Sequence, residues 1–295
     1  MGLYKNEAAK EAAYASYDKV MTLWPVPYEE IWVETAYGKS HVIVSGEKGK
    51  KPLYLLPGLF ADATMWFANA GELSKQCRVY CLDMITYGGK SEPSGKKVAR
   101  VEDYAAWFAQ VMDHFGHEKA AIAGLSYGGW LALALAREMP ERIAAVIMLD
   151  PSESFVKMDG GIFWRGFRDF AFFPSRRKYR RFFDWMGGGF RSPASDIWLE
   201  HMLDIIEHGS VGMFGIPQHR IYRQNELEAV RMPVLVMAGG KPILYKDPAA
   251  FAAAAAEALP HAEIEIIPQT GHGLQMEKAG TVNRRMVAFL TENYL

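Results

Sequence analysis

The chain has 295 residues, half of them hydrophobic, so it is long enough for one large domain, or one domain with an insertion, that buries a sizeable core. Its formal net charge is −1, so no long-range field would attract nucleic acid or an anionic membrane. This charge balance favours a small neutral substrate over a polyanionic partner.

The first 30 residues are charged and contain no apolar run of signal-peptide length. Residues 5–23 carry apolar side chains at helical spacing, which predicts an amphipathic helix packed on the domain. No later segment reaches the length of a transmembrane helix. Cys77 and Cys81 flank a predicted strand that would hold them roughly 13 Å apart, beyond disulfide reach. Free thiols indicate a reducing compartment, so we expect a cytoplasmic protein.

From residue 30 onward, β-rich runs alternate with segments of helical period. Strands are predicted at residues 31–37, 40–46, 53–58, 79–84, 120–126, 144–150, 234–240 and 262–269. Helices are predicted at residues 63–75, 101–115, 127–139, 247–259 and 277–294. The first two strands read as an antiparallel pair, and the later alternation predicts an α/β fold with a mostly parallel eight-stranded sheet and helices on both faces.

One long segment interrupts this alternation. Residues 152–229 contain no convincing strand but many aromatic side chains mixed with arginine. A long excursion between two core strands favours a helical lid over a structureless loop. We therefore predict a core formed by residues 1–151 and 230–295, with residues 152–229 as its lid.

Ser126 lies at the centre of the Gly-Leu-Ser-Tyr-Gly stretch at 124–128, between an apolar strand and an apolar helix. This is the context of a nucleophile elbow, in which a strained turn raises a serine hydroxyl above the sheet. The amide of Tyr127 would face a developing oxyanion. After the last predicted strand, His272 in Thr-Gly-His-Gly is a candidate general base. The alternatives are an incidental serine in a glycine-rich turn and a structural histidine.

These motifs resemble the α/β-hydrolase family and, within it, the bacterial carboxylesterase group that includes carboxylesterase NP. The stretches that carry the resemblance are LWPVPYE (23–29), HVIVSG (41–46), PGLFADATMW (57–66), GLSYGG (124–129), MPERI (139–143) and TGHGLQME (270–277). The resemblance runs nearly end to end and is weakest in the predicted lid. It implies hydrolysis of carboxylic esters through an acyl-serine intermediate, with no cofactor and no metal.

The resemblance also implies an oxyanion loop after the third strand. Family members place a His-Gly pair there, whereas this chain has Pro57 before Gly58. Because that histidine mainly braces the loop, its replacement leaves the Leu59 amide available, with Phe60 as the fallback. Together with Tyr127, this amide would complete the oxyanion hole.

The family's acid ordinarily follows the strand at 234–240, in a Gly-x-x-Asp/Glu pattern, but this chain has Pro242 at that position. Asp150 ends the preceding core strand, where some lipases carry their acid, and neighbouring strand ends share one crevice. Asp247 is the alternative acid, although an aspartate just before a proline is well explained as a helix cap. We expect Asp150 to orient His272, with Asp247 or no acid at all as the remaining possibilities.

An apolar substrate pocket is predicted around Phe60, Phe155, Phe163 and Trp164. The expected reaction is hydrolysis of small, fairly apolar esters. A lactonase, a thioesterase or a carbon–carbon bond hydrolase on the same fold is the first alternative. A ligand-binding homologue with weakened catalysis is the second, favoured by Pro57 and Pro242. The sequence leaves the oligomeric state open.

Overall fold

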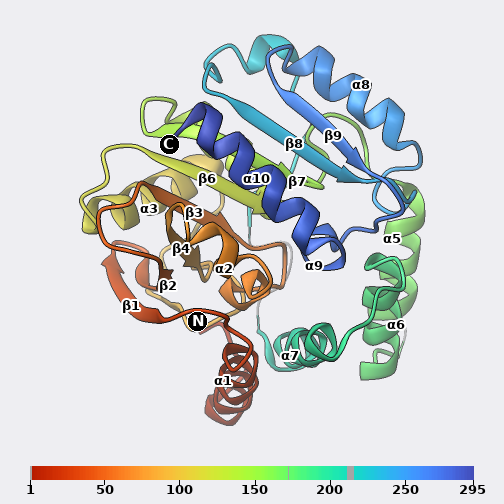
Figure 1. The fold of residues 1–295 in the computed structure, drawn as a ribbon. Helices are drawn as coiled ribbons and strands as arrows, with labels where there is room; N and C mark the ends of the chain where they lie inside the picture. The colour runs from red at the N-terminus through yellow and green to blue at the C-terminus, as the bar shows by residue number, and fades with distance from the viewer. Residues whose placement is uncertain (1, 172, 211–215) are drawn as a thin grey trace.

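The structure is a computed structural model that describes residues 2–171, 173–210 and 216–295. A single sheet runs through the molecule (Figure 1), and within the described residues it has nine strands. These are β1 (Tyr28–Thr35), β2 (Gly38–Ser45), β3 (Pro52–Leu56), β4 (Arg78–Leu82), β5 (Glu92–Pro93), β6 (Ala120–Leu125), β7 (Ile143–Leu149), β8 (Val234–Gly239) and β9 (Glu263–Ile267).

The strand order is β1-β2-β4-β3-β6-β7-β8-β9. Strands β1 and β2 pair antiparallel, as predicted, and β2 also pairs antiparallel with β4. From β4 to β9 every pairing is parallel. The predicted count of eight strands misses β5, a two-residue strand on β2 that is too short to leave a periodic signal.

Helices cover both faces of the sheet, because the central strands are apolar on both sides. In β3, for example, Tyr54 belongs to one hydrophobic core and Leu55 to the other. The first core packs under α3 (Val101–His114), α4 (Tyr127–Glu138) and α8 (Pro248–Ala258). The second packs under α1 (Glu7–Met21), η1 (Ala63–Trp66), α2 (Ala70–Leu73), α9 (Leu274–Glu277) and α10 (Ala279–Asn293).

Residues 152–229, called the insertion below, leave the sheet after β7 and return to it at β8. They include residues 172 and 211–215, which lie outside the described residues. The described part forms α5 (Gly160–Gly166), η2 (Phe167–Ala171), α6 (Arg176–Met186), α7 (Pro193–His208) and η4 (Gln224–Glu226). In Figure 1, α5, α6 and α7 lie together at one side of the sheet, and α1 packs beside α7.

Candidate active site

Ser126 occupies the turn between β6 and α4, at the carboxyl edge of the parallel strands. Its backbone has φ 57° and ψ −120°, a strained conformation that non-glycine residues adopt mainly at functional turns. Gly124 and Gly128 allow the end of β6 and the start of α4 to approach each other closely, since a Cβ on Gly124 would lie 2.2 Å from the Gly128 carbonyl carbon. The strand–turn–helix context that the motif predicts is therefore present.

Asp150 and His272 are in direct contact. His272 Nδ1 lies 2.6 Å from Asp150 Oδ2, and both side chains are buried. The other oxygen, Asp150 Oδ1, accepts the Gly239 amide over 3.2 Å at the end of β8. Because an ionised carboxylate can only accept, Nδ1 carries the proton in this pair, and Nε2 remains available to accept another.

Asp247 has a different role in the structure. Its Oδ1 accepts the amides of Ala249 and Ala250 over 2.9 and 3.2 Å, so Asp247 caps the N-terminus of α8. Its side chain is exposed, as is Pro242 in the turn after β8. Among the residues that the structure describes, no hydrogen bond or ion pair joins either of them to His272.

The hydroxyl of Ser126 meets a second serine. Ser126 Oγ lies 3.1 Å from Ser152 Oγ, and no hydrogen bond to His272 is present within the described ranges. No sequence motif singles out Ser152. Its place follows from the parallel pairing of β6 with β7, which brings the turns after these strands together.

Both predicted oxyanion amides come from elements next to Ser126. Tyr127 is the first residue of α4, so its amide has no carbonyl one turn earlier within the helix. After β3, a Cβ added to Gly58 would lie 3.5 Å from Ser126 Cβ. Leu59 and Phe60 follow, both half-buried, and Phe60 has φ 63°. This loop brings its backbone to the serine, as the predicted role requires.

Pro57 stands where a family histidine would brace this loop, and the loop is held from its other end. Asp62 Oδ1 accepts the Thr64 amide over 3.0 Å, and Asp62 Oδ2 lies 2.6 Å from His201 Nε2 on α7. Burial raises the pKa of Asp62, but the His201 imidazole holds it below its ordinary value. A buried contact between a histidine and a carboxylate therefore joins the insertion to the oxyanion loop, and no sequence motif marks it.

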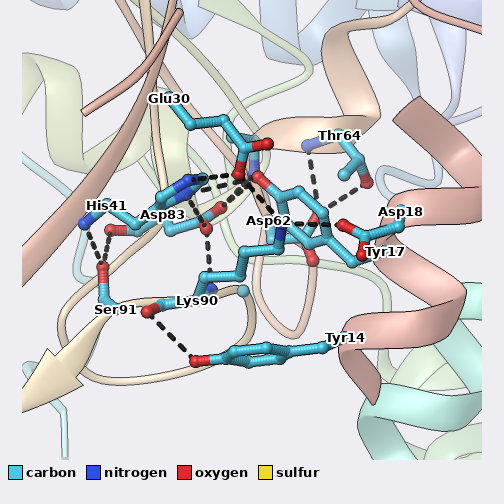
Figure 2. A network of polar contacts seen from close by, with 12 residues as sticks. Tyr14, Tyr17, Asp18, Glu30, His41, Asp62, Thr64, Asp83, Lys90 and Ser91 are labelled. Atoms are coloured by element: carbon cyan, nitrogen blue, oxygen red, sulfur yellow. Dashed lines mark hydrogen bonds and ion pairs between the residues drawn. The ribbon is translucent and has the colours of Figure 1, made fainter. Parts of the chain in front are cut away.

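A cluster of the buried His41, Asp83 and Lys90 with the partly exposed Glu30, called the His41 network, supports the same loop (Figure 2). His41 Nδ1 lies 2.7 Å from Asp83 Oδ2, and His41 Nε2 lies 2.9 Å from Glu30 Oε2. Lys90 Nζ donates to Glu30 Oε2 over 2.9 Å. Burial lowers the pKa of His41, but the two carboxylates outweigh it and raise this pKa to about 9. Asp83 Oδ1 also accepts the Ala63 amide over 2.8 Å, which fixes the end of the loop.

The insertion also contacts the histidine loop. The His272 amide donates to Met186 O, at the end of α6, over 2.9 Å. Lys241 Nζ, in the turn where the family carries its acid, donates to Gly188 O over 2.7 Å. A Cβ on Gly271 would lie 2.6 Å from Gly188 N, so the two loops are packed backbone to backbone.

The predicted pocket residues lie in different surroundings. Phe155 is buried, and its ring lies 5.8 Å from that of Phe251 on α8. Phe163 and Trp164 are 55% and 65% exposed on α5. Within the described residues, none of these three rings forms an aromatic contact with His272, whereas Phe60 lies on the oxyanion loop.

Among the described residues, no cluster of three or more His, Cys, Asp or Glu side chains could hold a metal ion. None of the described helices is both long and apolar enough to span a bilayer.

A parallel sheet that presents a serine elbow and a histidine–carboxylate pair at one edge is the architecture of serine hydrolases. The chain belongs to the Alpha/beta hydrolase family, which its residues 53–285 match.

Two similar proteins come from Bacillus subtilis strain 168. An uncharacterized carboxylesterase, Nap, is 30% identical over 283 residues, which cover 94% of this chain and 91% of the relative. Carboxylesterase YbfK is 30% identical over 286 residues, covering 94% and 93%. The crystal structure of naproxen esterase (carboxylesterase NP) from Bacillus subtilis superposes with a TM-score of 0.86 at 28% identity, covering 96% of this chain and 98% of that one.

Proposed function

We propose that the protein is a serine carboxylesterase whose triad consists of Ser126, His272 and Asp150. The observation that carries the proposal is the 2.6 Å contact between His272 Nδ1 and Asp150 Oδ2. Asp150 lies in the turn after β7, next to the turn after β6 that holds the strained Ser126. Similarity to carboxylesterases over nearly the whole chain supports ester hydrolysis.

In the proposed reaction, Ser126 Oγ attacks the ester carbonyl while His272 Nε2 takes the hydroxyl proton. The tetrahedral oxyanion is held by the amides of Tyr127 and Leu59, with Phe60 as the fallback donor. His272 then gives its proton to the departing alcohol. Water, deprotonated by the same imidazole, attacks the acyl-enzyme, and the proton returns to Ser126 as the carboxylic acid leaves.

Asp150 holds the imidazole in the tautomer that leaves Nε2 free to accept, and its charge stabilises the imidazolium that forms. Its location distinguishes this chain from the family pattern, in which the acid follows the next strand. The position next to Gly239 explains how the change can be accommodated, because Asp150 already reaches the end of β8.

We further propose that the insertion acts as a lid over small, fairly apolar esters, since the end of α6 packs against the histidine loop. The two buried free cysteines support a cytoplasmic location.

Labelling with a fluorophosphonate tests the nucleophile, with Ser126→Ala as the matched control. The expected result is one covalent adduct on the wild-type protein and none on Ser126→Ala. Turnover of short p-nitrophenyl esters beside thioesters and lactones then tests the substrate class, and esters should be hydrolysed fastest. An unlabelled wild-type protein, under conditions in which a control esterase reacts, would favour the ligand-binding alternative.

A further inference from the structure

The turn that supplies Asp150 also supplies a hydroxyl to the nucleophile. Ser152 Oγ lies 3.1 Å from Ser126 Oγ, and the Ser152 amide donates to Ser126 O over 3.1 Å. Two contacts therefore join these serines, one through side chains and one through the backbone. The inference below rests on the proposed function, because it concerns the reactivity of Ser126.

The turn itself is firmly held. Asp150 has φ 40°, and its amide donates to Met237 O over 2.6 Å. Tyr245 Oη donates to Pro151 O. Ser154 Oγ donates to Ser152 O over 3.2 Å, and Ser154 is fully buried. Since only 5% of Ser152 is exposed, its hydroxyl is fixed by its surroundings and is not a mobile surface group.

The direction of the hydrogen bond between the two hydroxyls follows from proton counting. Ser126 has one hydroxyl proton, and the proposed reaction requires that this proton go to His272 Nε2. In that state Ser126 Oγ can only accept from Ser152, so the Ser152 hydroxyl is the donor. Within the described residues, the Ser152 hydroxyl has no other hydrogen-bond partner that competes for its proton.

We propose that Ser152 is a positioning residue for the nucleophile. By donating to Ser126 Oγ it fixes the side-chain torsion of Ser126 and leaves the serine proton directed to the imidazole. The hydrogen bond strengthens as negative charge builds on Oγ during proton transfer, since charge-assisted bonds are the stronger ones. It acts again when Oγ departs from the acyl-enzyme. Both chemical steps therefore depend on it, whereas substrate binding does not.

Ser152→Ala should lower the rate of fluorophosphonate labelling and kcat for a p-nitrophenyl ester by about 10- to 100-fold, the range expected for one hydrogen bond to a charged group. KM should change by no more than about twofold, and the pH at half-maximal rate should stay that of the wild type, because His272 remains the base. In Ser152→Cys, whose S–H is a weak donor of similar size, the labelling rate and kcat should fall nearly as far. Ser152→Thr keeps the hydroxyl and should recover most of the rate.

Ser154→Ala is the matched control. It removes a buried hydroxyl from the same turn but not the donor to Ser126, so it should alter thermal stability without changing the labelling rate. Equal losses in Ser152→Ala and Ser154→Ala would show a purely structural role and overturn the proposal. Wild-type reactivity in Ser152→Ala, or failure of Ser152→Thr to recover, would overturn it while leaving the proposed function intact. A wild-type protein that does not react overturns both.

Discussion

At the scale of single residues, Asp150 and Asp247 differ in what their carboxylates hold. Asp150 accepts a hydrogen bond from His272 Nδ1, so Asp150→Asn should favour the tautomer that cannot receive the serine proton. The corresponding change in a related triad lowers kcat by about 10⁴, and we expect a loss of that order. Steady-state kinetics on a p-nitrophenyl ester measure it, and KM should change little.

Asp247→Asn supplies the comparison for this prediction. Asparagine caps helices as well as aspartate does, so the cap of α8 and the turnover should both be retained. A large loss of kcat in Asp247→Asn, with little change in Asp150→Asn, would move the proposed acid to position 247.

The sequence predicted Ser126, His272 and Asp150 by different kinds of reasoning. The first two lie in local motifs with a fixed backbone context. Asp150 required a non-local argument. Because Pro242 stands where the family carries its acid, a carboxylate at the end of the neighbouring strand was expected to replace it. Ser152, Asp62 and His201 carry no such mark, because their partners lie between 26 and 139 positions away in sequence.

At the scale of elements, the His201–Asp62 pair joins α7 of the insertion to the oxyanion loop. Both side chains are almost fully buried, so His201→Ala would leave the Asp62 carboxylate without its imidazole partner. Leaving a buried carboxylate without this hydrogen-bond partner costs at least about 1–3 kcal/mol of the free energy of unfolding. Urea denaturation should show a loss of that size, and kcat should also fall because the loop that carries Leu59 is loosened.

Ser16→Ala is the control for this change. Ser16 Oγ lies 2.7 Å from His201 Nδ1 and donates to the Ala13 carbonyl, so Ser16→Ala removes these two contacts but leaves the contact between His201 and Asp62 in place. We expect Ser16→Ala to lower the free energy of unfolding by about 1 kcal/mol and to leave kcat unchanged. Equal effects of His201→Ala and Ser16→Ala would mean that the contact between His201 and Asp62 does not support the loop.

Helix boundaries near this loop could not be predicted from periodicity. The single helix expected at 63–75 is two short ones, η1 and α2, separated at Asn69. The Asn69 side chain donates to Gln275 O and to Asn283 Oδ1, over 3.0 and 2.6 Å. These tertiary contacts with the C-terminal helices override the local helical pattern.

At the scale of the whole molecule, the alternation of strands and helices was enough to predict the fold class. Buried parallel strands need apolar residues on both faces, and this leaves a strong signal in the sequence. The same reasoning gave little detail for the insertion, whose helices α5 and α6 bury no residue completely. Their amphipathic pattern depends on packing against other parts of the chain, which the sequence does not show.

The pH dependence of stability is a further property of the whole molecule, and the His41 network makes a defined contribution to it. Glu30, partly exposed, has its pKa lowered to about 2, chiefly by the hydrogen bond from His41. Its contribution is present above its ordinary pKa of 4.5 and is lost as pH falls toward 2. Burial and Asp83 raise the pKa of Tyr17, so this neighbour keeps its proton in neutral and mildly basic solution. His41 is therefore the member whose proton is released between neutral pH and pH 9.

The raised pKa of His41, about 9 against an ordinary 6.5, means that the folded protein binds this proton more tightly than the unfolded chain. The stabilisation is complete below pH 6.5 and disappears as pH rises through 9, a change of about 3 kcal/mol. We therefore expect the free-energy difference between wild type and His41→Gln to shrink by this order from pH 6 to pH 9.5, measured by urea denaturation. The exposed His114→Gln should show no such trend. A difference independent of pH would mean that His41 is not held as a cation between Asp83 and Glu30.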